Sequence, residues 1–161
     1  MHMFRSAQPT DADRCFEIET AAYEGDEAAT LEKIRMRIEL YPQGFLLLET
    51  EAGVVGFINS GCADVVKMED DAFKEFVGHD ADAPNVVILS VVVDPAFQGQ
   101  GLSRVLMEEF VARMKAMNKA TIYLMCRDYN VPLYEKFGYR YLHPSASNLG
   151  GRAWHEMSMV L

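Results

Sequence analysis

The sequence predicts a mixed α/β fold in a single domain that spans residues 1–161. Three observations support this prediction. The length of 161 residues suits one domain that buries its own core. Half of the residues are hydrophobic and 24% are charged, which is ordinary for a globular protein. Apolar, β-branched runs alternate with segments of helical spacing, and this order favours a mixed sheet.

The N-terminal part of the chain is expected to contain helices between short strands. "MFRSA" predicts a strand, and Thr10 is the expected N-cap of a helix from Ala12 to Tyr23. Gly25 interrupts the helical pattern, which resumes over Glu27 to Leu40. "FLLLET" and "VVGFINSGC" flank a turn at "EAG" and predict a strand hairpin.

The second half begins with an acidic excursion over residues 64–82, in which "EDDAFKEF" predicts a short helix. "NVVILSVVV" is uniformly apolar and β-branched, which is typical of a central strand buried on both faces. A helix with apolar residues from Leu102 to Met117 follows. "TIYLMC" then predicts a strand, "NVPLYEKF" a short helix, and "YRYLH" with "AWHEMSMVL" a closing hairpin.

Composition argues against several kinds of partner. The formal charge of −9 disfavours nucleic acid, whose phosphates need a basic surface, and suits a neutral or cationic partner. No apolar run approaches the roughly 20 residues that span a bilayer, and the N-terminus does not resemble a signal peptide. We therefore expect no membrane association and a cytoplasmic location.

The cysteines are expected to be reduced and buried. Cys15, Cys62 and Cys126 are odd in number, widely spaced and embedded in apolar patterns. No Cys/His pair has the spacing of metal ligands, so we expect neither a structural zinc nor another bound metal.

The turn "QGQGLS" (residues 98–103) is the main local signal for a ligand. Backbone N–H groups in a tight turn before a helix converge with the positive end of the helix dipole, and such a turn binds phosphate or pyrophosphate. Gly99 and Gly101 would permit positive φ and close approach of the ligand, while Ser103 adds a hydroxyl and Arg104 a charge for a peripheral phosphate. Alternatively, the glycines only turn a strand into a helix. The turn is neither a Walker P-loop nor a Rossmann fingerprint.

A second segment, "MCRDYNVPLYEKFGY", places Asn130 and then Tyr134 after another strand. Two parallel strands, each followed by a helix, form a crevice at their carboxyl ends. An extended molecule with a diphosphate at one end would fit between the glycine turn and Asn130.

Together, D-P-x-x-Q-x-x-G-x-S and N-x-x-L-Y-E-K-x-G-Y resemble the GNAT superfamily of acetyl-CoA-dependent N-acetyltransferases. Ser103 departs mildly from the family signature Q/R-x-x-G-x-G/A. "FEIETAAY", "VVGFI", "LMCRD" and "HEM" look most like the arylalkylamine (serotonin-type) members. The resemblance implies a single-domain GNAT-like fold: a central, mostly antiparallel mixed sheet with a splayed parallel pair and helices on both faces.

The resemblance also implies direct attack of an amine on the thioester of acetyl-CoA in a ternary complex. Tyr134 matches the tyrosine that gives a proton to the departing sulfur, because a phenol with a pKa of about 10 stays protonated at neutral pH. Its alternative role is that of a core aromatic. The expected acetyl-CoA contacts are Val91, Val93, Gln98, Gly99, Gln100, Gly101, Leu102, Ser103, Arg104 and Asn130.

The proton acceptor departs from the family pattern. Val87 and Leu89 occupy the places of two histidines in the vertebrate-type enzymes, and neither side chain accepts a proton. Two interpretations stay open: a water chain assisted by Asn59, Ser60 or Ser90, or an amine that arrives partly neutral. The remaining histidines, at 79, 143 and 155, are weaker candidates, and His79 is expected in an exposed loop.

The acceptor site is expected near "YEGDE" and the acidic excursion, because both combine carboxylates with aromatics that would attract a ring-bearing cation. An alternative is a solvated acidic surface in which Phe73 and Phe76 anchor a helix. The expected amine contacts are Tyr23, Glu24, Asn59, Val87 and Leu89.

Three functions remain open. The leading hypothesis is acetyl-CoA-dependent acetylation of a small primary amine, with an arylalkylamine as one candidate. The alternatives are a protein N-terminal acetyltransferase and a non-catalytic acyl-CoA-binding sensor domain. The closing strands and "SASNLGGRAW" are a candidate homodimer surface.

Overall fold

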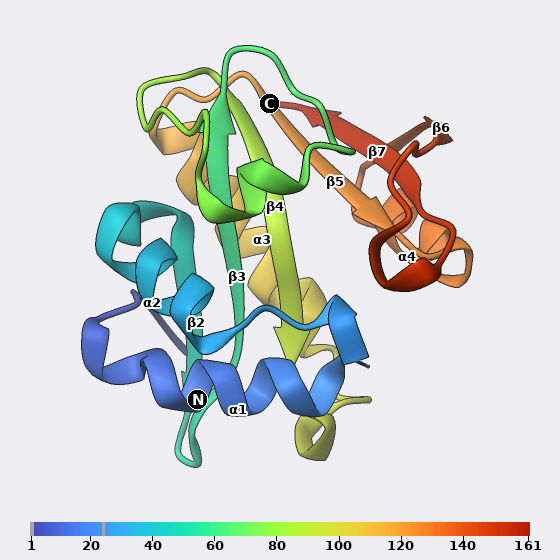
Figure 1. Ribbon diagram of the computed structural model, residues 1–161. Coiled ribbons are helices and arrows are strands. Elements are labelled where there is room, and N and C mark those ends of the chain that lie inside the picture. Colours follow the sequence, from blue (N-terminus) through green and yellow to red (C-terminus); the bar gives the residue numbers. More distant parts are fainter. Residues whose placement is uncertain (1, 24) are drawn as a thin grey trace. The chain divides into compact units, whose positions relative to one another are not determined.

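The computed structural model describes residues 2–23 and 25–161 (Figure 1). Its strands form a seven-stranded sheet in the order β1-β2-β3-β4-β5-β7-β6, with one parallel pair, β4 and β5. This mixed sheet with its α-helices confirms the predicted fold class. The chain divides into two compact units: unit 1 contains residues 1–60 and 90–110, and unit 2 contains residues 61–89 and 111–161.

Unit 1 is built from an antiparallel strand set and two helices. Strands β1 (Met3–Ser6), β2 (Phe45–Thr50) and β3 (Gly53–Ala63) pair in sequence, and β3 ends in unit 2. Helices α1 (Ala12–Ala22) and α2 (Leu31–Leu40) contribute apolar faces to one core. That core includes Cys15, Ile18, Ile34, Ile38, Phe45, Phe57 and Val92.

In unit 1, α1 begins at Ala12 as predicted, but the cap of this helix and the start of the second helix differ from the prediction. Thr10 lies inside a 3-10 turn, Pro9–Asp11, and is not an N-cap; the Asp11 carboxylate accepts from the Gln8 amide over 2.7 Å and so fixes this turn. The second helix begins at Leu31 because the Thr30 side chain caps it by accepting from the Lys33 amide over 3.3 Å.

Unit 2 holds the remaining strands. β5 (Thr121–Cys126) pairs antiparallel with β7 (His155–Val160), which pairs antiparallel with β6 (Arg140–Pro144), as the closing hairpin predicted. Helix α4 (Val131–Lys136) follows β5. β4 (Asn85–Val93) and α3 (Leu102–Ala116) each have residues in both units.

The parallel pair is short. Within the described part of unit 2, β4 and β5 pair at Asn85–Thr121, Val86–Ile122 and Val87–Tyr123, although both strands continue further. Beyond Val87 and Tyr123 the strands no longer pair, which agrees with the expected splayed pair. The main-chain groups of the two carboxyl halves that face this seam are therefore not used by the neighbouring strand.

The acidic excursion contains a 3-10 turn, Asp71–Glu75, in place of the predicted helix (Figure 1). The Asp70 side chain caps the turn, and Phe76 ends it at φ 63°, in the left-handed region. Phe73 and Phe76 are buried against β3, where a Cβ on Gly61 would lie 2.9 Å and 3.1 Å from the two rings. The aromatics therefore anchor the excursion, in agreement with the alternative interpretation.

All three cysteines are free and buried, as predicted. Among the described helices, none has the length and apolar character needed to cross a membrane.

Candidate active site

The glycine turn lies in unit 1, directly before α3. Gly99 and Gly101 have φ values of 81° and 74°, and a Cβ on either residue would meet no atom within 4 Å. The glycines are therefore required by backbone conformation, and the space above them is open. An anionic group fits this turn, because the first amides of a helix have no partner within the helix.

The turn is fixed to the end of β4 by side chains. Asp94 accepts from the Ala96 amide over 3.0 Å and pairs with Arg14 at 2.6 Å; these two contacts, in that order, hold the pKa of its carboxyl below the ordinary value. The Gln98 side-chain amide donates to the Val93 carbonyl over 3.2 Å. Gln98 thus positions the turn through its side chain.

The other expected cofactor residues of unit 1 divide by exposure. Gln100 and Arg104 are exposed and Ser103 is half-buried, whereas the Leu102 side chain is buried, which leaves its amide for a ligand. The Val91 carbonyl accepts a hydrogen bond from the Tyr23 hydroxyl over 3.1 Å. Tyr23, expected to contact the amine, therefore ties the end of α1 to β4. Glu24 lies outside the described residues.

A polar cluster lies in the interior of unit 1: Glu19 on α1, Arg37 on α2, Asn59 on β3 and Ser90 on β4. Glu19 is 1% exposed; its Oε2 accepts from the Ala29 amide over 2.7 Å, and Ser90 makes a side-chain hydrogen bond to the carboxylate. Arg37 donates to Asn59 Oδ1 over 3.3 Å. Burial raises the pKa of Glu19 and lowers that of Arg37 to about 10.

This buried polar cluster includes two residues that the sequence analysis missed. Glu19 lies four residues after Cys15 on the apolar face of α1, and Arg37 lies between Ile34 and Ile38 on the apolar face of α2. One charged residue of opposite sign on each apolar face was the available signal. Of the expected candidates, the structure brings Asn59 and Ser90 to this cluster. The Ser60 hydroxyl donates to the Gly44 carbonyl over 3.0 Å.

Tyr134 lies on α4 in unit 2. Its ring makes edge-to-face contacts with Phe137 and Tyr139, at centroid distances of 5.9 Å and 6.0 Å. Burial, together with the nearby Cys126 thiol, raises the pKa of Tyr134 above its ordinary value. The phenol therefore stays protonated throughout the neutral range and is able to donate a proton. Asn130 immediately precedes α4, and its side chain does not cap the helix.

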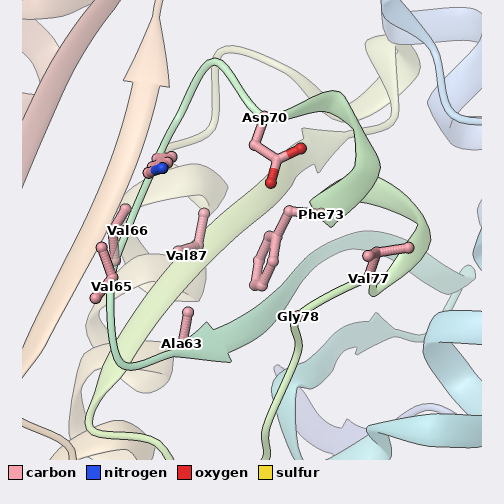
Figure 2. A pocket seen from close by; sticks show the side chains of 9 residues that line it. Ala63, Val65, Val66, Asp70, Phe73, Val77, Gly78 and Val87 are labelled. Atoms are coloured by element: carbon pink, nitrogen blue, oxygen red, sulfur yellow. The ribbon is translucent and has the colours of Figure 1, made fainter.

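Unit 2 also contains an apolar pocket of about 80 Å³ (Figure 2). Its lining residues are Ala63, Val65, Val66, Lys67, Asp70, Phe73, Val77, Gly78 and Val87. Figure 2 shows the Asp70 carboxylate above the Phe73 ring, with Val87 beside that ring on the side of Val66. Leu89 packs against the same cluster as Val87. Two expected amine contacts thus belong to this apolar region, whereas the surrounding valines were not predicted to line a pocket.

The weaker histidine candidates each have a local partner. His79 is half-buried, so its expected exposed position is wrong: its Nδ1 accepts from the Cys62 amide over 3.0 Å and its ring stacks on Phe76, because the excursion folds back onto β3. The His143 ring contacts the Pro144 carbonyl, and the His155 ring contacts the Tyr141 hydroxyl. Within residues 2–23 and 25–161, no three His, Cys, Asp or Glu side chains gather as metal ligands would.

Comparison with known sequences finds one family. The sequence model of the Acetyltransferase (GNAT) family matches residues 12–139. Curated relatives include the serotonin N-acetyltransferases of Mesocricetus auratus and Macaca mulatta, which are 29% and 30% identical to this chain. Each alignment covers 98% of this chain, with 77% of the hamster protein and 78% of the macaque protein.

Comparison with solved structures finds the same fold. The loading GNATL domain of CurA from Lyngbya majuscula has a TM-score of 0.86 at 19% identity, over 99% of this chain and 98% of that domain. The GphF GNAT-like decarboxylase in complex with isobutyryl-CoA has a TM-score of 0.81 at 16% identity, over 98% of each chain.

Proposed function

Since the chain belongs to the Acetyltransferase (GNAT) family, whose members use acetyl-CoA, we propose that it acetylates the primary amine of a small molecule. The amine attacks the thioester carbonyl directly while both substrates are bound. Direct attack needs an oriented thioester, an acceptor for the ammonium proton and an acid for the leaving thiolate.

Tyr134 is the observation that carries this proposal. A phenol whose pKa is raised by burial stays protonated at neutral pH, so Tyr134 is in the form that can donate to the negative charge that develops on the departing sulfur. Tyr134 thus protonates the sulfur of CoA as the carbon–sulfur bond breaks.

The proposed acetyl-CoA contacts use mainly backbone groups. The amides from Gly99 to Ser103 bind the pyrophosphate, and the positive φ values and open space at the two glycines support this role. Main-chain groups of Val91 and Val93 orient the thioester arm, and Arg104 pairs with a peripheral phosphate. Asn130 contacts the pantetheine.

The apolar pocket supports an acceptor with a small apolar body. Valine side chains and Phe73 form most of its wall, and Asp70 supplies a carboxylate that attracts a cation. The names of the curated relatives, serotonin N-acetyltransferase, also support such an acceptor, since serotonin is an arylalkylamine. We therefore propose an aryl- or alkyl-substituted ethylamine as the acceptor.

A thiol-release assay with acetyl-CoA tests the function directly. The amine panel contains tryptamine, phenylethylamine, propylamine, a polyamine, an amino sugar and a peptide with a free N-terminus, and calorimetry measures acetyl-CoA binding in parallel. We expect turnover of the aryl- or alkylethylamines. Turnover of the peptide alone would assign an N-terminal acetyltransferase, and tight binding without turnover of any amine would favour the sensor function.

A further inference from the structure

The Glu19 carboxylate is buried without full compensation of its charge. Only 1% of the residue is exposed, and Oε1 has no hydrogen-bond partner in the described part of the chain. Oε2 accepts from the Ala29 amide. A buried carboxylate with one oxygen unpartnered is costly, so the retention of Glu19 points to a role in which the carboxylate accepts a proton.

The polar neighbours of Glu19 lead to β4. Ser90 makes a side-chain hydrogen bond to the carboxylate, and Tyr23, one helical turn after Glu19, donates to the carbonyl of Val91. The end of α1 therefore reaches two successive residues of β4. Ser90 follows Leu89, one of the two positions at which related enzymes carry a histidine, so the carboxylate is linked to the strand segment that otherwise lacks a base.

We propose that Glu19 is the terminal proton acceptor of the acetyl transfer, reached through the Ser90 hydroxyl. This inference rests on the proposed function and assigns the base that Val87 and Leu89 do not supply. The Ser90 oxygen accepts one proton from the substrate ammonium as its own proton passes to the Glu19 carboxylate. The ammonium becomes a neutral amine, the carboxylate becomes a carboxylic acid, and Ser90 is unchanged. The proton leaves Glu19 for solvent after the acetylated amine is released.

The charged and titratable groups around Glu19 set its basicity. Burial raises the pKa of the carboxyl, which makes Glu19 a stronger base than a surface carboxylate. Arg37 of α2 acts in the opposite sense through its positive charge, and the Ser90 hydrogen bond and the Ala29 amide also favour the charged form. Cys15 of α1 is the other titratable neighbour, and burial keeps its thiol neutral by raising its pKa to about 12.

The test compares amines that differ in basicity and little in shape. The probes are phenylethylamine, propylamine and their analogues difluorinated beside the aminomethyl group, which are much weaker bases and arrive neutral at the assay pH. We expect Glu19→Gln to lower kcat with the ordinary amines by at least about tenfold. With the fluorinated analogues, kcat should be close to that of the wild type, because no ammonium proton has to be removed. The decrease of kcat/KM toward low pH should be smaller in the variant than in the wild type.

Glu39→Gln is the matched control, since Glu39 is an exposed glutamate on α2. Ser90→Ala should reproduce the selective loss, and Glu19→Asp should recover part of the activity. Thermal unfolding and acetyl-CoA calorimetry of each variant report on folding. Equal losses with ordinary and fluorinated amines would make Glu19 a structural residue, and unchanged kcat with both would also overturn the proposal. A wild-type protein that acetylates none of these amines would overturn the proposed function itself.

Discussion

The buried polar cluster of unit 1 and the apolar pocket of unit 2 use the same strand in opposite ways. In unit 1, β4 presents Ser90 to a buried carboxylate and a buried guanidinium. In unit 2, β4 presents Val87 to a wall of valines and Phe73. Under the proposed mechanism, nearby residues of one strand therefore serve proton transfer in one unit and apolar recognition in the other.

The two regions also tolerate change differently. An apolar wall loses contact area when one side chain is altered, and the free energy of acceptor binding changes in proportion to that area. A buried carboxylate depends on each neighbour, because removal of one partner leaves a charge uncompensated. Substitutions in the two units should therefore separate effects on the chemical step from effects on acceptor affinity.

The largest effect is expected at Tyr134, the proposed proton donor, which lies on α4 in unit 2. Tyr134→Phe should lower kcat by roughly 10²-fold, the usual contribution of a general acid, while acetyl-CoA affinity stays unchanged. Steady-state kinetics and calorimetry measure the two quantities. Tyr129→Phe is the control, since Tyr129 is 69% exposed. A kcat for Tyr134→Phe equal to that of the wild type across pH would remove Tyr134 from the mechanism.

A second prediction separates backbone strain from ligand contact in unit 1. Gly101→Val should weaken acetyl-CoA binding by about 30-fold, because a side chain at φ 74° strains the turn and covers the amides. Gly53→Val is the matched control: Gly53 has φ 96° and equally open surroundings, but lies in the β2–β3 turn. Both variants should lose similar thermal stability. Equal affinities in calorimetry would show that the glycine turn does not hold the cofactor.

A third prediction concerns the pocket of unit 2. Val87→Phe should fill part of the space, and KM for phenylethylamine should rise about tenfold, while KM for propylamine changes little. Val160→Phe serves as the control, since Val160 is 80% exposed. A uniform change in kcat for both amines would place Val87 in the chemical step and so weaken the contrast between the two regions.

The smallest effect contrasts two carboxylates of unit 1. The Arg5 hydrogen bond holds the pKa of Asp11 below its ordinary 3.8, so Asp11 stabilises the fold above that pH and the stability is lost as pH falls through the folded-state pKa. Burial raises the pKa of Glu19 above its ordinary 4.5, so its contribution is present below that pH and is lost as pH rises through the folded-state pKa.

Asp11→Asn should therefore destabilise the protein by about 1 kcal/mol near neutral pH, whereas Glu19→Gln should leave stability unchanged or raise it by up to about 1 kcal/mol. Urea unfolding at about pH 4 and about pH 8 measures both differences, and each should shrink toward the acidic condition. If Glu19→Gln destabilised the protein near neutral pH as much as Asp11→Asn does, the charge of the Glu19 carboxylate would be fully compensated in the fold.

The sequence predicted the strands well because their signals are local. "NVVILSVVV" and "TIYLMC" match β4 and β5, since β-branched, aromatic and other apolar residues favour strands with buried positions. Helix starts were less predictable, because several residue types cap a helix. Thr10 and Thr30 are equally good caps by residue type. Only Thr30 caps a helix, because Thr10 lies inside the turn that Asp11 fixes.

The polar cluster was beyond local patterns. Glu19 and Arg37 are far apart along the chain, and each alone reads as an ordinary surface charge at the edge of an apolar face. Their burial depends on how α1 and α2 pack together in unit 1. The apolar pocket was missed for a similar reason: the valines of the excursion line a pocket only because the chain folds back over β3.

The short ladder of three residue pairs between β4 and β5 has a consequence for the stability of the protein. If main-chain groups of β4 beyond Val87 bind acetyl-CoA, the cofactor acts as a missing strand, and these hydrogen bonds exist only in the folded state. Mass action then adds stability with cofactor concentration, about 2.7 kcal/mol at one hundred times Kd. The melting temperature should then rise with the concentration of acetyl-CoA. The lifetime of the folded protein would in that case depend on how much acetyl-CoA is present.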